Sequence, residues 1–497
     1  MMTRLTLLAH LWLAFAAPAF AARIFAEDEP IAGGLPVLEM SGTFAEIYEK
    51  LDGVKWAGKD VRVAVESSVE GLAPGIHAAA TDRRIVLLHK DDIIGNWDRP
   101  SDGNWSEYGQ ITAAMVLKLR ERLPDLAALG APEIYNAAIA SIMKGIDKNG
   151  RYIYSKKEEL QNDPHVLTSL GIAGVRTSAG DYLLNTIFKG SPADNAGLSD
   201  GDILVSANGT ALRDLSDMEV LGLFNGFSSG TIKVRAIGSD KKEKSAAIRR
   251  ASIVMADADI VVRDTILEII IHKITDNAVD VAAEAIDKYK HDGIYLDLRG
   301  ATGDDELAMA KMAGLFMGKI PIAKIARTAQ EELEIIPGGD AMTQAPVVVA
   351  TSNATSGSAE GLAYAFYEAG RAVLIGVPTA GKAMLSTRID LKSGGALELK
   401  NREIKSGRGN TINGRGFFPP ICLSNIRTSE QKNVFLVNVR NHEWSARDFN
   451  KENIDPKSVR KGCPNITSGA DEDAVASAVA FDILLGEKVY DALLQKN

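Results

Sequence analysis

Apolar residues recur at helical spacing in the first third of the chain. From Ile111 to Leu123 many of them fall about four residues apart, and a second such stretch runs from Ile134 to Ile146. This period gathers apolar side chains into one stripe along a helix, and the stripe can then be buried against a core. Residues 22–160 are therefore predicted to form a mainly helical N-terminal region.

The pattern changes near residue 165, where short apolar runs separated by Gly, Asn and Asp continue to about residue 250. Such runs are typical of strands and turns, so a β-rich module is predicted over residues 165–252. Strands and helices then alternate, which favours an α/β core over residues 253–497. The predicted elements are strand 266–274, helix 277–290, strand 293–298, helix 305–318, strand 346–350, helix 359–369, strand 372–376 and a final helix 472–494. The predicted fold class is α/β and α+β, multidomain, with a parallel or mixed sheet in the core.

The N-terminus has the pattern of an export signal. Arg4 precedes an apolar run from Leu5 to Phe20, and Ala19 and Ala21 place small residues where a signal peptidase reads. The alternative is an uncleaved membrane anchor, but the run is short and Pro18 interrupts a helix near its end. We expect residues 1–21 to be a cleaved signal peptide and the protein to be exported, periplasmic or extracellular. No later segment is long and apolar enough to predict a membrane span.

Composition narrows the function classes. The chain has 46% apolar and 24% charged residues, which is ordinary for a soluble globular protein. Its formal net charge is -9, and its Lys and Arg residues are dispersed, whereas nucleic-acid binding needs a basic face. No nucleic-acid partner and no cofactor are therefore predicted.

The two cysteines are predicted to be bonded to each other. In an exported protein a pair of cysteines is often a disulfide, and Cys422 and Cys463 would close a loop in the last segment. The alternative is two unrelated buried thiols. A metal site is not predicted, because neither cysteine has a CxxC partner or a nearby His at ligand spacing.

The stretch GSPADNAGLSDGDILVSANG, residues 190–209, resembles the PDZ domains found in proteases. Its residues fit such turns, since Gly197 can end a short helix with a positive φ and Asn208-Gly209 is a hairpin sequence. PDZ domains bind a peptide C-terminus as an added strand and hold its carboxylate by backbone N–H groups. The resemblance implies that this loop is Leu170, Gly171, Ile172 and Ala173, and that helix 215–224 lines the groove. A purely structural PDZ fold is the alternative.

Two further segments resemble the carboxy-terminal processing, or tail-specific, serine peptidases, whose core is ClpP/crotonase-like. They are GIYLDLRG at 293–300 and PVVVATSNATSGSAEGLAYAFYEAGRAVLIGVPTAGKAMLST at 346–387. The resemblance covers about residues 140–497. It implies that Gly303 supplies an oxyanion N–H group and that Lys382 is the catalytic lysine of a Ser–Lys dyad. We expect Lys382 to be buried and to face the turn 356–358, because burial favours the neutral amine that the dyad needs.

The sequence departs from this family at the nucleophile. The family serine lies three residues before the position of Glu360, and that position is Gly357. Ser358 is the first candidate nucleophile, because it lies closer to the helix start, and Ser356 is the second. Asp304 and Ser386 also depart from the family pattern, and Asp304 would disfavour an oxyanion unless it points away.

Two functions remain open from the sequence. One is an exported serine endopeptidase that cleaves proteins or peptides recognised through their free C-termini. The other is an inactive pseudopeptidase that acts as a PDZ peptide-binding or scaffold protein, for which Gly357 is the supporting feature. A lipid- or retinoid-binding relative of the fold would need an apolar cavity, and no sequence feature predicts one.

Overall fold

The fold is taken from a computed structural model of the chain. It describes residues 37–53, 61–153, 166–224, 230–328, 331–441, 443, 450, 454–464 and 470–494, apart from 178, 189, 239, 255, 393, 427 and 487. The predicted signal peptide, residues 1–21, lies outside the described residues. The chain divides into two compact units, one of Met1–Tyr152 with Ile389–Leu397 and the other of Ile153–Arg388 with Glu398–Asn497. The inclusion of residues 389–397 in the first unit was not predicted.

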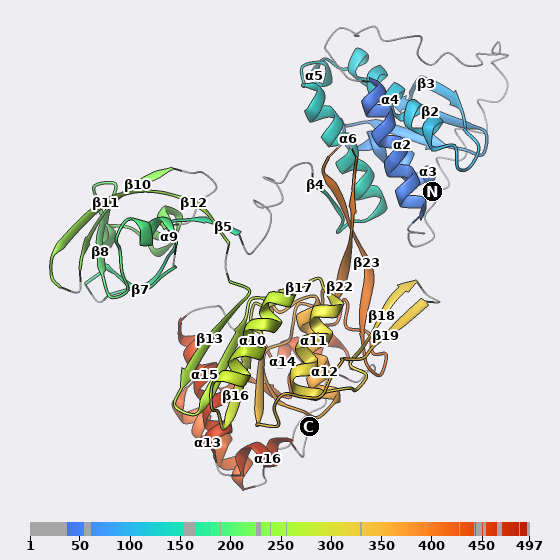
Figure 1. The fold of residues 1–497 in the computed structure, drawn as a ribbon. Helices are drawn as coiled ribbons and strands as arrows, with labels where there is room; N and C mark the ends of the chain where they lie inside the picture. Colours follow the sequence, from blue (N-terminus) through green and yellow to red (C-terminus); the bar gives the residue numbers. More distant parts are fainter. Residues whose placement is uncertain are drawn as a thin grey trace. The chain divides into compact units, whose positions relative to one another are not determined.

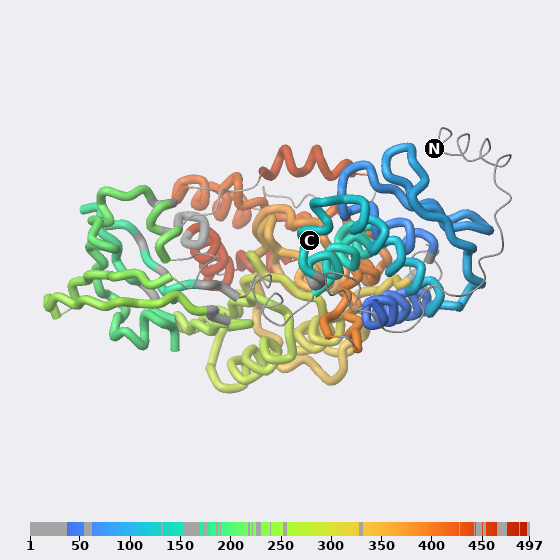
Figure 2. Tube along the Cα trace, turned by 90° about the horizontal axis from the view of Figure 1, so that it is seen from above, coloured from blue at the N-terminus to red at the C-terminus, as the bar shows by residue number. Residues whose placement is uncertain are grey.

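Helices make up most of the described part of the first unit, as the apolar spacing predicts. Helix α2 packs along α4, where the Tyr48 hydroxyl lies 2.6 Å from Thr112 Oγ1. Helix α3 packs against α6, where Ser141 Oγ donates to the Ser67 carbonyl at 2.6 Å. The helices are α2 (Val37–Gly53), α3 (Val61–Glu70), α4 (Trp105–Arg122), α5 (Pro124–Ala127) and α6 (Ala131–Ile146), drawn from blue to teal in Figures 1 and 2.

The first unit also contains a three-stranded antiparallel sheet that the sequence reading missed. Its strands β1 (Ile76–Ala80), β2 (Arg84–His89) and β3 (Asp92–Asp98) pair in chain order. The strands are as long as those of the core, but β3 leaves Ile93 exposed and buries only Gly95. A strand with so little buried apolar surface gives only a weak sequence pattern.

The β-rich module has one antiparallel sheet in the order β11-β10-β8-β7-β6, so that β6 lies at one end. The predicted turn residues have the expected conformations, with positive φ at Gly197, Asn208 and Gly209. The hairpin at Asn208-Gly209 connects β8 to the short strand β9 (Thr210–Ala211). The other strands are β6 (Ile172–Arg176), β7 (Tyr182–Ile187), β8 (Ile203–Ala207), β10 (Thr231–Ile237) and β11 (Glu243–Arg249), and the helix is α9 (Asp217–Phe224).

The α/β core is built on a mixed six-stranded sheet in the order β13-β14-β16-β20-β21-β24. Only β13 is antiparallel to its neighbour, and the other pairs are parallel, which confirms the predicted fold class. The strands are β13 (Ala258–Arg263), β14 (Ile266–Ile271), β16 (Gly293–Asp297), β20 (Val347–Thr351), β21 (Val373–Gly376) and β24 (Ile421–Cys422).

Helices cover both faces of this sheet (Figure 1). Leu296 and Val349 point into the apolar cluster under α10 (Asp276–Lys288), α11 (Glu306–Met317) and α12 (Ser358–Glu368). Tyr295 and Val348 point into the opposite cluster, which is formed with the helices α13 (Ser429–Arg440), α15 (Ala470–Leu485) and α16 (Val489–Leu494). Burial on both faces explains why these strands read as continuous apolar runs.

A second sheet in the order β19-β18-β23-β22 lies in the later part of the chain. Its strands are β18 (Ala323–Thr328), β19 (Glu331–Ile335), β22 (Met384–Asp390) and β23 (Ala396–Ser406). Strand β22 follows directly on the loop that contains Lys382. The sheet therefore fixes the far end of that loop.

The prediction of a single final helix over 472–494 is wrong. The structure has α15 and α16 with a break at Gly486 and Lys488, where Lys488 adopts a φ of 64°. A helix cannot continue through a residue in the left-handed region, so the chain turns and starts again at Val489. Both helices keep apolar side chains in the same cluster, which is why their apolar pattern reads as one helix.

Candidate active site

Three loops meet at the carboxyl ends of neighbouring parallel strands. Strand β16 pairs with β20, and β20 with β21, all in the same direction. We call the loops that follow them the glycine loop (298–304), the serine turn (352–357) and the lysine loop (377–383). Ligands bind at this edge of open α/β sheets, and all the candidate catalytic residues lie on these loops or directly after them.

The glycine loop is tied to the serine turn by hydrogen bonds. The Thr355 hydroxyl donates to the Leu298 carbonyl at 2.7 Å, and the Ser356 N–H group donates to the Ala301 carbonyl at 2.9 Å. Thr355 is fully buried, so its hydroxyl needs such a partner. These contacts fix the position of the turn relative to Gly303.

Gly357, which the sequence resemblance places at the nucleophile position, has no room for a side chain. Its φ is 64°, and a Cβ atom built on it would lie 2.0 Å from the Gly303 carbonyl oxygen. Its N–H group donates to the Lys382 carbonyl at 3.1 Å. Glycine is required here both by the backbone conformation and by the close approach of the glycine loop.

The two candidate serines lie in different surroundings. Ser358 is the first residue of α12 and is fully buried, and its Oγ has no hydrogen-bond partner in the described part of the chain. That Oγ would lie 2.0 Å from a Cβ built on Gly303, so it packs against this glycine. Ser356 is partly exposed. Ser356 is therefore the more exposed of the two candidate serines.

The prediction that Lys382 is buried is wrong, although the structure places its backbone beside the serine turn. Its N–H group donates to Glu360 and its carbonyl accepts from Gly357, at 2.8 and 3.1 Å. The side chain is exposed to solvent. The residues beside it, Gly381 and Ala383, are buried, so the exposure is a property of the side chain and not of the loop.

Glu360 organises the lysine loop, a role that the sequence reading had not given it. Its buried carboxylate accepts hydrogen bonds from Thr379 Oγ1, Gly381 N and Lys382 N at 2.5, 2.6 and 2.8 Å. Burial raises the pKa of Glu360, and these hydrogen bonds, with one from Gly357 N, act in the opposite direction. Its position two residues into the first turn of α12 could have suggested a carboxylate that binds nearby N–H groups.

Asp304 is engaged by the second sheet. Its carboxylate accepts from the Ser386 N–H group at 2.6 Å and forms an ion pair with Lys400 Nζ at 3.0 Å. Ser386 on β22 and Lys400 on β23 thus hold the Asp304 carboxylate, and the lysine partly neutralises its negative charge. The unfavourable effect predicted for Asp304 on an oxyanion is reduced by this pairing.

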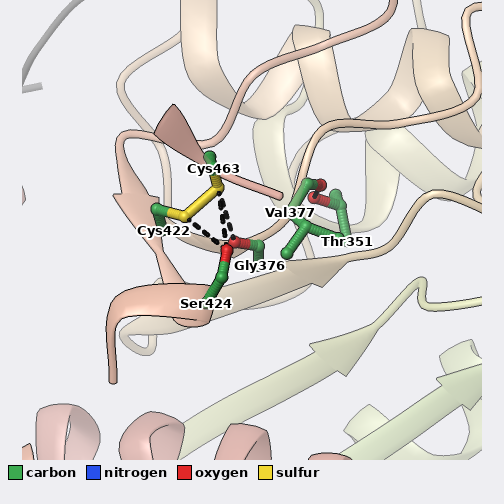
Figure 3. Close-up of a disulfide and its surroundings, with 6 residues drawn as sticks. All are labelled: Thr351, Gly376, Val377, Cys422, Ser424 and Cys463. Atoms are coloured by element: carbon green, nitrogen blue, oxygen red, sulfur yellow. Dashed lines mark hydrogen bonds between the residues drawn. A yellow bond between two sulfur atoms is a disulfide. The ribbon is translucent and has the colours of Figure 1, made fainter. Parts of the chain in front are cut away.

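Cys422 and Cys463 form the expected disulfide, with their Cα atoms 5.9 Å apart (Figure 3). The bond joins the end of β24 to the residue that follows helix α14 (Pro456–Gly462). Ser424 Oγ lies 3.0 Å from Cys422 Sγ and 3.5 Å from Cys463 Sγ. The disulfide therefore fastens α14 to the edge of the core sheet.

The predicted carboxylate loop of the β-rich module precedes the end strand β6. Leu170 N donates to the Phe224 carbonyl of α9 at 2.9 Å, and Gly171 N donates to Ser169 Oγ at 3.0 Å. Ile172 and Ala173 begin β6, and among the described strands only β7 pairs with β6 in this sheet. The loop is thus next to α9 and to the end strand of the described sheet, but the N–H groups of Leu170 and Gly171 already have partners in the protein.

Within the described residues, no group of three or more His, Cys, Asp or Glu side chains is arranged to hold a metal ion. The described helices include none that is long and apolar enough to cross a membrane.

The chain is similar to known proteins over parts of its length. Residues 265–422 match the model of peptidase family S41, and residues 185–221 match that of the PDZ domain. The chain is 24% identical over 297 residues to the carboxy-terminal processing protease CtpA of Bacillus subtilis (strain 168). It is 25% identical over 297 residues to a CtpA-like serine protease of Staphylococcus haemolyticus (strain JCSC1435). These matches cover 58% of this chain and 64% and 60% of the relatives, so the chain spans about 60% of their length.

Solved structures of similar proteins include the photosystem II D1 C-terminal processing protease. It is 20% identical and covers 58% of this chain and 81% of its own, with a TM-score of 0.38. A second is mature CPAF in complex with lactacystin, which is 9% identical and covers 91% of this chain and 99% of its own, with a TM-score of 0.38.

Proposed function

We propose that this protein is an exported serine endopeptidase. The proposal is supported by its resemblance to the carboxy-terminal processing peptidases of family S41 and by its match to the PDZ domain. In this proposal Ser356 is the nucleophile and Lys382 the general base, and substrates are proteins or peptides with free C-termini. The observation that carries it is the partial exposure of Ser356, on the turn whose next residue is hydrogen-bonded to Lys382. Ser358 has no comparable access, because it is buried against Gly303.

The proposed reaction proceeds through an acyl-enzyme. Ser356 Oγ attacks the scissile carbonyl carbon while Lys382 Nζ, in its neutral form, accepts the hydroxyl proton. The Gly303 N–H group stabilises the negative oxygen of the tetrahedral intermediate. Lys382 then donates the proton to the leaving amine, and a water molecule, deprotonated by the same lysine, hydrolyses the ester and restores Ser356.

The exposed lysine sets a condition on this mechanism. A general base must be unprotonated, and contact with water favours the charged ammonium. A bound substrate that covers Lys382 would remove water from the amine and favour the neutral form. Catalysis is therefore expected only when a peptide lies over the lysine loop.

The test replaces single residues and measures cleavage of an unstructured fluorogenic peptide with a free C-terminus. Ser356→Ala and Lys382→Ala should each reduce kcat/KM on the order of a thousandfold or more. Ser358→Ala should keep most of the activity, because its hydroxyl makes no hydrogen bond in the described part of the chain. Lys319→Ala, which removes an exposed lysine outside the three loops, is the matched control. Loss with Ser358→Ala and not with Ser356→Ala would contradict the assignment.

A second candidate function is supported by the lack of room for a side chain at Gly357, the residue that the sequence resemblance places at the nucleophile position. Gly357 faces the Gly303 carbonyl so closely that no side chain fits there. The protein would then bind peptides through its PDZ domain without cleaving them. If the wild type binds such peptides but cleaves none over a range of substrates, this second function is the correct one.

Export is part of the first proposal and is tested separately. Sequencing the N-terminus of the mature protein should show cleavage after Ala21 or close to it, as the A-x-A pattern predicts. A mature protein that keeps Met1 or Met2 would contradict it.

A further inference from the structure

We infer that Arg460 is a positioning residue that holds the lysine loop, and that the Cys422–Cys463 disulfide keeps Arg460 in place. The inference rests on the proposed role of Lys382. Arg460 lies 78 residues after that lysine (460 − 382), on helix α14, and no motif in the sequence connects the two. The connection is made by the contacts of its guanidinium group.

The Arg460 guanidinium links two loops. Its Nη2 donates to the Thr379 carbonyl at 2.7 Å and to the Arg415 carbonyl at 3.0 Å, and the group lies 5.6 Å from the centre of the Phe418 ring. A Cβ built on Gly416 would lie 2.7 Å from the Thr379 carbonyl oxygen and 2.8 Å from Nη2, so the glycine leaves room for this hydrogen bond. The Arg460 side chain is therefore held in one position by several contacts and is not a free surface side chain.

Thr379 passes this contact on to the lysine loop. It is fully buried, its hydroxyl donates to Glu360 at 2.5 Å, and it accepts from Phe417 N at 2.7 Å. The same Glu360 carboxylate binds the N–H groups of Gly381 and Lys382. Arg460 therefore holds the Thr379 carbonyl, and the Thr379 hydroxyl orients the Glu360 carboxylate. That carboxylate in turn fixes the Lys382 backbone.

Charge supports the same arrangement. Burial lowers the pKa of Arg460, and the negative charge of Glu360 opposes this shift. A cation and a carboxylate on either side of Thr379 attract each other through a partly dry region, where such attractions are stronger than in water. Removing the cation is expected to loosen the loop between them.

The disulfide fixes the helix that carries Arg460. Cys463 directly follows α14 and is bonded to Cys422 on β24, which pairs with β21. Cys463 Sγ also lies 3.9 Å from the Gly376 carbonyl, at the start of the segment that leads into the lysine loop (Figure 3). Helix α14 is thus attached to residues 376 and 379, three residues apart, by one sulfur contact and one guanidinium contact.

Hydrogen–deuterium exchange of the full-length protein tests the inference without requiring activity. Arg460→Ala should speed exchange of the Gly381 and Lys382 amides by about tenfold or more, because their acceptor Glu360 loses its support. The double variant Cys422→Ser/Cys463→Ser should shift the same amides in the same direction. Lys461→Ala, an exposed cation on the same helix with no contact to these loops among the described residues, should leave both amides unchanged.

Two outcomes overturn the inference. One is unchanged exchange at Gly381 and Lys382 in Arg460→Ala, and the other is a uniform increase that includes strands β16 and β20, which indicates general destabilisation. Arg460→Lys keeps the charge but loses the fork of donors, and should fall between wild type and alanine. If Arg460→Ala does not fold, Arg460→Lys and the disulfide variant decide between these outcomes.

Kinetics then separate this inference from the proposed function. If the wild type cleaves peptides, Arg460→Ala should lower kcat about tenfold or more and change KM by less than about twofold, since it misplaces the base and not the substrate. A change in KM alone would contradict a positioning role. If the wild type cleaves nothing, the proposed function fails while the exchange result still decides the role of Arg460.

Discussion

Gly357 decides how the serine turn is built. Its positive φ lets the chain pass from the turn into α12, and the missing side chain lets the Gly303 carbonyl approach. The glycine and the buried Ser358 thus form one packed contact with the glycine loop. A side chain at position 357 would disturb this contact, and the more exposed serine, Ser356, lies one residue earlier.

Gly357→Ala should destabilise the protein by about 2 kcal/mol or more, from the left-handed backbone and from overpacking against Gly303. The matched control is Gly370→Ala, just beyond the other end of α12. Gly370 also has a positive φ, of 59°, but nothing lies within 4 Å of a Cβ built there. Gly370→Ala should lower the free energy of unfolding only by the cost of the left-handed backbone, about 1–2 kcal/mol. Urea unfolding midpoints measure both, and equal losses would show that the Gly303 contact contributes nothing.

Glu360 should make stability depend on pH. Its pKa is raised in the folded protein by burial, so the native state binds more protons than the unfolded state once the pH exceeds the ordinary value of 4.5. Its contribution to stability is fully present below that value and is lost as the pH rises through the raised pKa. Glu360→Gln cannot titrate, so wild type should lose stability relative to this variant as the pH rises above 4.5 and through the raised pKa.

The measurement is the difference between the urea midpoints of wild type and Glu360→Gln at several pH values in that range. The variant keeps an amide oxygen as an acceptor for the N–H groups of Gly381 and Lys382 but is expected to be less stable overall. Only the trend with pH is diagnostic. A difference that stays constant with pH, or that grows in favour of wild type, would contradict the raised pKa.

At the scale of elements, apolar period and length determine what the sequence can predict. The core elements were predicted within a few residues, from strand 293–298, observed as β16, to helix 359–369, observed as α12. They are buried on both faces or along one stripe, so their patterns are strong. The β1–β3 sheet was missed because β3 buries little apolar surface and so has a weak pattern. The break at Lys488 was missed because its backbone conformation leaves no apolar signal.

The sequence could predict only which loops meet at the site, because this follows from the order of the strands along the chain. Gly303, the serine turn and Lys382 come after successive predicted strands, and parallel strands bring such loops together. The exposure of Lys382 and the burial of Ser358 depend on side-chain packing between loops, which the sequence pattern does not contain. Arg460 had no sequence signal, because it reaches the lysine loop across the fold through backbone carbonyls.

At the scale of the whole molecule, the chain carries a segment that matches the PDZ domain and a candidate catalytic core. A module that holds a substrate tail raises the effective concentration of the rest of that substrate for any site on the same chain. Selection of free C-termini by the PDZ domain would then choose substrates, and the core need recognise only an extended stretch of backbone. The two roles can therefore be separated by variants that remove one and keep the other.

Binding of a peptide C-terminus should not depend on the catalytic residues. Full-length Ser356→Ala protein should bind a peptide with an apolar, free C-terminal residue, because β6 is the end strand of the described sheet and backbone N–H groups can hold a carboxylate. The same peptide with an amidated C-terminus is the matched control and should bind about tenfold more weakly or worse, since it lacks the carboxylate charge. Ser169→Ala removes the hydroxyl that accepts from Gly171 N and should strengthen binding of the free peptide, because that N–H group is released to the carboxylate. Calorimetric titration measures all three, and equal affinity for the free and amidated peptides would rule out carboxylate recognition by this loop.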